Sequence, residues 1–130
     1  NGDPIDIYNN GNMKRDFTYI DDIIHGIIKL IDKIPDNQKS SISASSPPYK
    51  IYNIGNNSPV TLNEFITAIE NACGKKAIKN LLPMQPGDVP TTFADIDDLI
   101  KDVGFKPSTT IQEGIEKFVA WYLHTQQSNL

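Results

Sequence analysis

Few residues of this sequence combine a reactive side chain with a neighbour that could activate it. The two histidines, His25 and His124, lie far apart in the chain, and each is interpreted as a residue on a helix surface. Asp95, Asp97 and Asp98 form an acidic group, but it lacks the glycine and the final glutamate of a calcium loop. We expect these aspartates to begin a helix, where carboxylates interact favourably with the helix dipole. The sequence therefore predicts no metal site and no catalytic residue.

The glycines of the chain are too widely spaced to form a loop around a pyrophosphate. They stand at positions 2, 11, 26, 55, 74, 87, 104 and 114. A dinucleotide site needs closely spaced glycines, because backbone amides must approach the phosphates at a helix N-terminus. The phosphate loop with Gly-Lys-Ser/Thr is missing too, since Gly74-Lys75 is followed by Lys76. We therefore expect this chain to bind no NAD by itself.

Composition and charge are those of one ordinary globular domain. The chain has 130 residues, 38% hydrophobic and 22% charged, with a net charge of −4. Its basic residues are scattered, so we expect neither a nucleic-acid surface nor an anionic membrane surface. No apolar run approaches the roughly 20 residues that span a bilayer. Because Cys73 is the only cysteine, a reducing cytoplasmic location is expected.

The elements that must position any site begin with a strand and a helix. Residues 4–8 alternate and predict a short strand, and residues 9–12 predict a turn. Isoleucine and leucine recur at helical spacing over residues 20–34, so this stretch predicts a helix that ends before Pro35. The serine- and proline-rich residues 36–50 are expected to form a mobile surface loop.

The second half of the chain predicts four further elements. They are a strand at 49–54, a helix from the capping box Thr61–Glu64 to Gly74, a helix at 95–103, and a helix from a second capping box, Thr110–Glu113, to about Thr125. Strands and helices are mixed without an internal repeat. The fold class expected is α/β, as a mixed α+β arrangement, with residues 1–130 forming a single domain.

Several motifs resemble, in the same order, those of the extended short-chain dehydrogenase/reductases that act on nucleotide sugars. Residues 15–22 resemble the family motif Arg-Asp-Phe/Tyr-x-x-Val/Ile-x-Asp. The motifs that follow are Tyr52–Asn56, Val60–Leu62, Gln85–Val89, Ala94–Asp95, Gly104–Pro107 and Trp121–Tyr122. The ordered set spans nearly the whole chain. Within the family, residues 84–89 look most like UDP-glucuronate 4-epimerases and related capsular-polysaccharide epimerases.

The resemblance implies that this chain is the C-terminal, nucleotide-sugar-binding portion of a larger enzyme. The NAD-binding Rossmann domain, with its glycine loop and its Tyr-x-x-x-Lys pair, would lie outside the chain. None of the five tyrosines here is followed by lysine four positions later. The fold implied is the small substrate-binding domain of a Rossmann-type enzyme, inactive alone. The parent enzyme is implied to be a homodimer.

The resemblance assigns binding roles to Arg15 and Asp88. Arg15, the only arginine, is implied to bind the diphosphate, which suits a planar guanidinium that stays ionised. The alternative is a surface ion pair with Asp16. Asp88 is implied to accept hydrogen bonds from the ribose hydroxyls, and the alternative is an ordinary turn aspartate after Gly87.

Three more residues complete the implied substrate site. Gln85 stands where several relatives have a second phosphate-binding arginine, and its amide could donate to a phosphate or a ribose hydroxyl. Ile7 and Tyr8 match a segment that flanks the uracil, largely through main-chain groups, although Tyr8 could equally be a plain strand aromatic. Structural roles are expected for four other motif residues: Phe17 in the core, Asp22 in helix capping, and Asn53 and Gly55 in a turn.

The reaction implied is NAD-dependent epimerisation of a UDP-sugar at C4, with UDP-glucuronate as the implied substrate. The cofactor would carry the hydride, and this portion would hold UDP while the sugar turns. Two alternatives stay open. The parent could be a nucleotide-sugar 4,6-dehydratase, or the chain could be a stand-alone, non-catalytic binding module.

Overall fold

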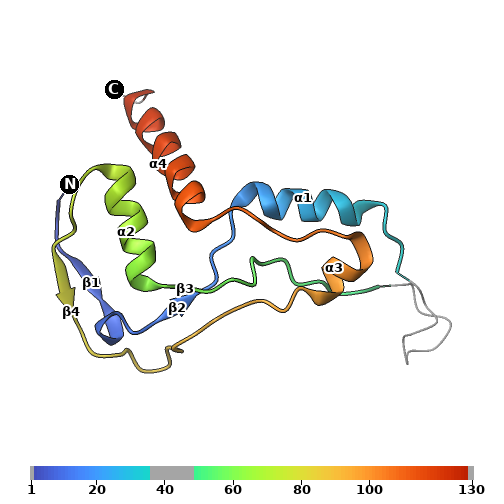
Figure 1. Ribbon diagram of the computed structural model, residues 1–130, viewed down its shortest axis with the longest axis horizontal. Coiled ribbons are helices and arrows are strands. Elements are labelled where there is room, and N and C mark those ends of the chain that lie inside the picture. Colours follow the sequence, from blue (N-terminus) through green and yellow to red (C-terminus); the bar gives the residue numbers. More distant parts are fainter. Residues whose placement is uncertain (1, 36–48, 129–130) are drawn as a thin grey trace.

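The computed structural model describes residues 2–35 and 49–128. The elements are β1 (Ile5–Ile7), the 3₁₀ helix η1 (Tyr8–Gly11), β2 (Lys14–Arg15), α1 (Ile20–Ile31), β3 (Val60–Thr61), α2 (Leu62–Cys73), β4 (Lys79–Leu81), α3 (Asp97–Val103) and α4 (Ile111–Ser128) (Figure 1). This arrangement confirms the mixed α/β fold class. Most of the loop predicted at 36–50 lies outside the described residues.

Two short sheets join distant parts of the chain. β1 pairs with β4 in parallel, with Ile5 opposite Lys79, and β2 pairs with β3 in antiparallel orientation, with Arg15 opposite Val60. Figure 1 shows α2 and α4 on the same side of the molecule as β1 and β4, while α1 and α3 lie at its other end. Contacts join α2 to α4 and α1 to α3. The two ends therefore have separate helix pairs.

The buried apolar core is small and draws on both ends of the molecule. Its members are Ile7, Met13, Ile66, Ala68, Ile96, Leu99 and Val119. The most deeply buried are Ile96 and Leu99, which are 1% and 0% exposed and lie at the start of α3. At the other end, Ile66 of α2 and Val119 of α4 are buried. Each end of the molecule thus contributes side chains that are shielded from water.

The capping box predicted at the start of α2 is confirmed. The Thr61 hydroxyl accepts a hydrogen bond from the Glu64 amide at 3.2 Å, and the Glu64 carboxylate accepts from the Thr61 amide at 2.7 Å. α2 ends at Gly74, which has a left-handed φ of 66°. The second capping box is half formed. The Thr110 hydroxyl accepts a hydrogen bond from the Glu113 amide at 3.2 Å, but the Glu113 carboxylate forms an ion pair with Lys117.

Four predictions about these elements are wrong. α3 begins at Asp97, so Asp95 lies before the helix that it was predicted to begin. The strand expected at 49–54 is absent, because no described strand lies beside this extended segment to supply hydrogen bonds. Tyr8 begins η1 and is not part of the strand. α1 ends at Ile31, before the predicted Ile34, where a turn bond from the Lys33 amide to the Leu30 carbonyl leads the chain out of the helix ahead of a proline.

Helix α1 has three different sides. One side is packed: Asp22 and Gly26 are buried, and Gly26 lies against Ile54 and Phe105. A second side is polar and carries Asp21, His25, Lys29 and Asp32. The third side is an exposed apolar stripe at helical spacing, here called the isoleucine stripe: Ile20, Ile24, Ile27, Ile28 and Ile31, between 45% and 71% exposed. The sequence pattern predicted the helix, but part of its apolar surface is uncovered.

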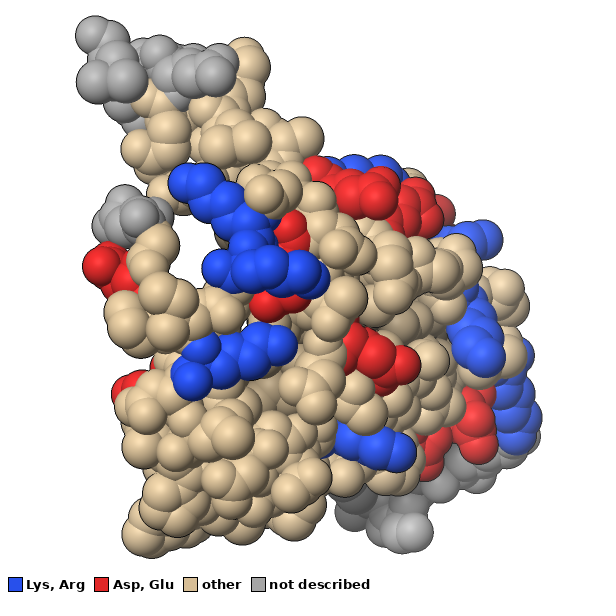
Figure 2. Space-filling view, turned by 60° about the vertical axis from the view of Figure 1, so that its left-hand side comes forward, with Lys and Arg blue, Asp and Glu red and all other residues tan. Residues whose placement is uncertain are grey.

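A basic group lies near the end of α2. Lys76 pairs with Glu70 at 2.6 Å, and Lys79 lies 3.7 Å from the same carboxylate, which is largely buried. The hydrogen bond from Lys76 lowers the pKa of Glu70. In Figure 2, basic and acidic side chains lie interspersed on this face of the molecule. The positive charge is therefore partly neutralised and does not form a continuous basic surface.

Candidate functional site

The candidate site lies where β2 meets the turn at residues 85–88. The Asp88 amide donates to the Gln85 carbonyl at 3.2 Å, and Gly87 has a φ of +83°. Proline at the second position and glycine at the third suit a type II turn, which requires a positive φ there. After the turn, the Lys14 amide donates to the Pro90 carbonyl at 2.8 Å. The turn is thus held against β2 by backbone bonds.

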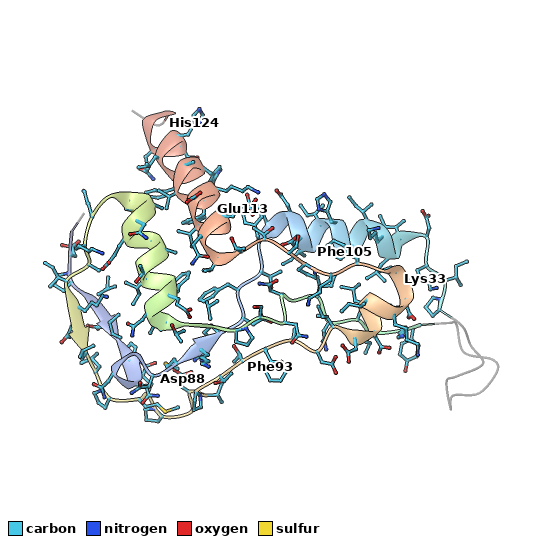
Figure 3. All side chains as sticks on the ribbon, viewed as in Figure 1. Lys33, Asp88, Phe93, Phe105, Glu113 and His124 are labelled. Carbon is cyan, nitrogen blue, oxygen red and sulfur yellow. The ribbon has the colours of Figure 1, made fainter. Side chains whose placement is uncertain are left out.

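Arg15 and Asp88 form an ion pair across this junction. Arg15 Nη2 lies 2.8 Å from Asp88 Oδ1, and the two side chains are 27% and 29% exposed. Arg15 Nη1 also donates to the Lys14 carbonyl at 2.9 Å and to the Pro90 carbonyl at 3.4 Å. Figure 3 shows Asp88 on the segment that runs beside β2. The alternative in which Arg15 pairs with Asp16 is wrong.

The ion pair leaves part of its hydrogen-bonding capacity for a ligand. Both hydrogen bonds that Asp88 accepts from described residues reach Oδ1: one comes from Arg15 and the other from the Val89 amide at 2.9 Å. Oδ2 is therefore available to accept from a hydroxyl. An anion that binds Arg15 must share the guanidinium with Asp88. Such sharing is possible because the planar guanidinium has five N–H donors.

The other three candidate residues have different settings. Gln85 is exposed and lies in the same turn as Asp88. The Ile7 side chain is buried at 3% exposure, and its carbonyl accepts from the Leu82 amide at 2.9 Å. Tyr8 is half-buried in η1. The ligand roles of Ile7 and Tyr8 stay predictions.

Asp16 has a role that the sequence did not indicate. Its Oδ2 accepts from the amides of Asn57 and Ala94, each at 3.0 Å, and its Oδ1 accepts from the Ser58 amide at 3.2 Å. One carboxylate therefore joins three segments of the chain beside Arg15. The only signal in the sequence was its place in the motif at residues 15–22.

Asp22 also links remote segments. It is 6% exposed, and its carboxylate accepts from the Thr109 amide at 3.0 Å. The helix-capping explanation is wrong, because the N-cap of α1 is Tyr19 and no side chain caps it. Asp22 instead fixes the segment that leads into α4.

Three further motif residues have structural contacts. Phe17 is half-buried and stacks on Phe65 with ring centroids 4.1 Å apart, so it packs against α2 but is not one of the buried core residues that the sequence led us to expect. The Asn53 side-chain amide donates to the Asp95 carbonyl at 3.1 Å. A Cβ added to Gly55 would lie 2.4 Å from Ala94 Cβ, so glycine is needed for a close approach of two segments.

A charged cluster anchors the extended segment at 49–54 to α3. Lys50 Nζ lies 2.7 Å from Asp102 and 2.9 Å from Asp98, and the Tyr52 hydroxyl donates to Asp102 at 2.6 Å. Hydrogen bonds from Lys50 and then Tyr52 lower the pKa of Asp102 from 3.8 to about 2. The same contacts raise the pKa of Lys50 and of Tyr52. Sequence analysis did not identify this cluster.

Two kinds of feature are absent from the part of the chain that the structure describes, residues 2–35 and 49–128. No three His, Cys, Asp or Glu side chains there lie close enough together to hold a metal ion. No described helix combines the length and the apolar character needed to cross a bilayer.

Several known proteins are similar to this chain. Residues 1–55 match the NAD dependent epimerase/dehydratase family. Protein CapI of Staphylococcus aureus is 55% identical over 130 residues, covering 95% of this chain and 39% of that protein. A probable UDP-glucuronate 4-epimerase of Rhizobium meliloti is 44% identical, covering 94% of this chain and 38% of that protein. The chain thus spans less than two fifths of these relatives.

Solved structures agree in fold. The UDP-glucuronic acid 4-epimerase of Bacillus cereus, in complex with UDP-glucuronic acid and NAD, superposes with a TM-score of 0.75 at 27% identity, covering 95% of this chain and 36% of that chain. The dTDP-glucose 4,6-dehydratase of Bacillus anthracis has a TM-score of 0.72 at 19% identity, over 97% and 36% of the respective chains, so it shows a shared fold alone.

Sequence and fold agree in what the chain is similar to. The chain is similar to a part of proteins that include UDP-glucuronate 4-epimerases, and its first 55 residues match the NAD dependent epimerase/dehydratase family, which is the resemblance that the motifs indicated.

Proposed function

We propose that this chain binds the UDP part of a nucleotide sugar, and that the complete protein is an NAD-dependent UDP-glucuronate 4-epimerase. The observation that carries the proposal is the Arg15–Asp88 pair, set at 2.8 Å between β2 and the turn at 85–88. This pair occurs in a chain that is 44% identical to a probable UDP-glucuronate 4-epimerase. A guanidinium and a carboxylate side by side match a ligand that carries phosphates next to hydroxyl groups.

In this proposal the two side chains divide the recognition of UDP. Arg15 binds the diphosphate through donors that it does not use for Asp88. Asp88 holds the guanidinium through Oδ1 and accepts from a ribose hydroxyl through Oδ2. Gln85, in the same turn, donates its amide to a phosphate or ribose oxygen. Ile7 and Tyr8 are proposed to lie beside the uracil.

NAD is proposed to bind outside this chain, in a Rossmann domain of the same polypeptide. The spacing of the glycines in the sequence does not suit a dinucleotide loop. The cofactor supplies the hydride acceptor and donor for oxidation and reduction at C4. The residues of this chain bind the UDP end and keep it fixed while the sugar turns, which maintains the geometry for the second hydride transfer.

The uncovered surfaces support a second domain. The isoleucine stripe of α1 exposes five large apolar side chains in one row, an arrangement that proteins normally cover. The segment at 49–54 is extended and has no strand partner among the described residues. We propose that the Rossmann domain covers the stripe and pairs with this segment, which would then become the strand that the sequence predicts.

The direct test is an assay of the complete protein with NAD and UDP-glucuronate. Chromatography should detect UDP-galacturonate, the C4 epimer, whereas the 130-residue chain alone should form no product and bind no NAD. A 4,6-dehydratase would instead convert a nucleotide hexose to a 4-keto-6-deoxy sugar. Binding of UDP without turnover of either substrate class would support the stand-alone module and contradict the epimerase.

Two further properties are proposed for the complete protein. We propose a homodimer, which size-exclusion chromatography with light scattering should show as twice the mass of one chain. We also propose a cytoplasmic location and a role in cell-envelope polysaccharide biosynthesis. The free thiol of Cys73, which is exposed, is compatible with a reducing compartment.

A further inference from the structure

We propose that Asp16 is a positioning residue that sets the spacing between Arg15 and the segment that carries Asp88. The proposal rests on the proposed function, because it concerns how the same UDP site is held together. Asp16 follows Arg15 directly, at the point where β2 ends. Its carboxylate is bound by three backbone amides from two segments that are remote in sequence.

On one side, the Asp16 side chain extends the pairing between β2 and the segment that follows Asp88. The Thr92 amide donates to the Lys14 carbonyl at 3.3 Å, as in a parallel ladder. Two residues further along both segments, the Ala94 amide donates to Asp16 Oδ2 at 3.0 Å. The carboxylate thus takes the place of the next backbone acceptor and holds the segment from Asp88 to Ala94 alongside β2.

On the other side, the same carboxylate holds the turn that leads into β3. Asn57 donates to Oδ2 at 3.0 Å and Ser58 donates to Oδ1 at 3.2 Å. Arg15 itself is opposite Val60 in the antiparallel pair. Asp16 therefore bridges the two neighbours of β2, one that carries Asp88 and one that pairs with Arg15.

The two segments approach each other closely at the Asp16 carboxylate. A Cβ on Gly55 would lie 2.4 Å from Ala94 Cβ and 3.3 Å from Asp16 Oδ2. The chain at 55–58 and the chain at Ala94 thus meet at the Asp16 carboxylate. A displacement of either one would be transmitted along a short path to Pro90, whose carbonyl accepts from Arg15.

The asparagine variant offers a graded disruption, because an amide has one acceptor oxygen where a carboxylate has two. If the oxygen of the introduced amide takes the Oδ2 position, the bonds from Asn57 and Ala94 remain and the bond from Ser58 is lost. If the oxygen takes the Oδ1 position, the bond from Ser58 remains and the other two are lost. We therefore expect Asp16→Asn to act in the same direction as Asp16→Ala, with a smaller effect.

The experiment measures UDP affinity by calorimetry and steady-state kinetics in the complete protein. Asp16→Ala should raise the Kd for UDP about tenfold or more, because loss of three charge-assisted hydrogen bonds to the backbone frees the segments that hold Arg15 and Asp88 in place. KM for the UDP-sugar should rise in parallel, while kcat should change less than about twofold, because Asp16 does not touch the reacting atoms. The control Asp32→Asn, at an exposed position after α1, should change neither value.

A double variant separates positioning from general destabilisation. Because Asp16 acts through Arg15 and its partner, Asp16→Asn should weaken UDP binding less in an Arg15→Ala background than in the wild type. Equal effects in both backgrounds would overturn the positioning role. If Asp16→Ala does not fold, Asp16→Asn decides the question by the same comparison.

The outcomes also distinguish this inference from the proposed function. A wild-type protein that binds no UDP contradicts the proposed function, and the positioning role with it. A wild-type protein that binds UDP, loses affinity on Arg15→Ala, and keeps its Kd within about twofold on Asp16→Ala contradicts the positioning role alone.

Discussion

Helices α1 and α2 have the same length, yet in the described part of the chain the apolar side chains of α1 are more exposed than those of α2. α2 buries Ile66 and Ala68, contacts α4, and begins with a complete capping box. α1 buries Asp22 and Gly26 on one side, but Ile27 and Ile28 are 49% and 55% exposed. The difference lies in what is available to pack against each helix.

The comparison separates two kinds of information in a hydrophobic pattern. The 3.6-residue period predicts a helix because it places apolar side chains on one face. It does not say whether the covering surface belongs to the same chain or to another domain. The proposed UDP site lies beside β2, close to the covered end, whereas the isoleucine stripe belongs to the end for which we propose a domain contact.

The largest expected effect comes from placing a charge in the isoleucine stripe. If another domain covers the stripe in the complete protein, Ile24→Asp should lower the free energy of unfolding by more than about 3 kcal/mol, because a buried charge replaces a buried apolar side chain. Lys29→Asp, on the polar side of α1, is the control and should have little effect. Urea denaturation of both variants is the measurement. Equal, small effects would show that the stripe is not covered.

At the proposed UDP site, removal of the guanidinium should have the next largest effect. Arg15→Ala should weaken UDP-sugar binding by about 1.5–3 kcal/mol, the usual value for a charge-assisted contact, with little change in the free energy of unfolding. Lys14→Ala, one position earlier in β2 and exposed, is the matched control. Steady-state KM and calorimetric Kd provide the measurement. A change under about twofold in both would make Arg15 a structural residue that only binds Asp88.

Asp88 should discriminate between nucleotides by their ribose hydroxyls. The wild type should bind UDP more tightly than 2′-deoxy-UDP by about 1–3 kcal/mol, and Asp88→Ala should bind the two nearly alike. Asp88→Ala also releases Arg15, so both ligands should bind more weakly. The four affinities form a double-mutant cycle in which this general loss cancels. A preference that survives the substitution would show that Asp88 does not contact the ribose.

The smallest expected effect concerns the cluster at the α3 end. The folded-state pKa of Asp102 is about 2, below its ordinary 3.8, because Lys50 and Tyr52 bind the carboxylate. A lowered folded-state pKa stabilises the fold at pH values above the unfolded-state pKa, and this contribution is lost as the pH falls from about 4 toward about 2. Thermal unfolding of Asp102→Asn should therefore be less pH-dependent in this range than that of the wild type. Asp32→Asn is the control, and identical profiles for wild type and Asp102→Asn would contradict the assignment.

Local features were predictable from sequence where local chemistry decides them. The capping box at Thr61, the left-handed glycines that end α2 and α3, and the turn around Gly87 depend on residues within a few positions. The family resemblance was likewise readable from ordered motifs. The strand predicted at 49–54 is absent, because a strand forms only beside a partner and the local sequence does not say whether one is there.

The sequence did not predict the features of the site that depend on contacts between residues far apart in the chain. Arg15 and Asp88 were each singled out, but their direct pairing was not, since they are separated by 73 positions. Asp16 was considered only as a partner for Arg15, whereas it binds three backbone amides. A carboxylate in a motif can serve a ligand or the backbone, and only the fold decides between these roles.

The most direct test of the central claim is a crystal structure of the complete protein with UDP bound. We predict that phosphate oxygens lie within hydrogen-bonding distance of the Arg15 guanidinium, and that a ribose hydroxyl donates to Asp88 Oδ2. UDP bound elsewhere, with Arg15 in contact with Asp88 and the backbone alone, would contradict the account.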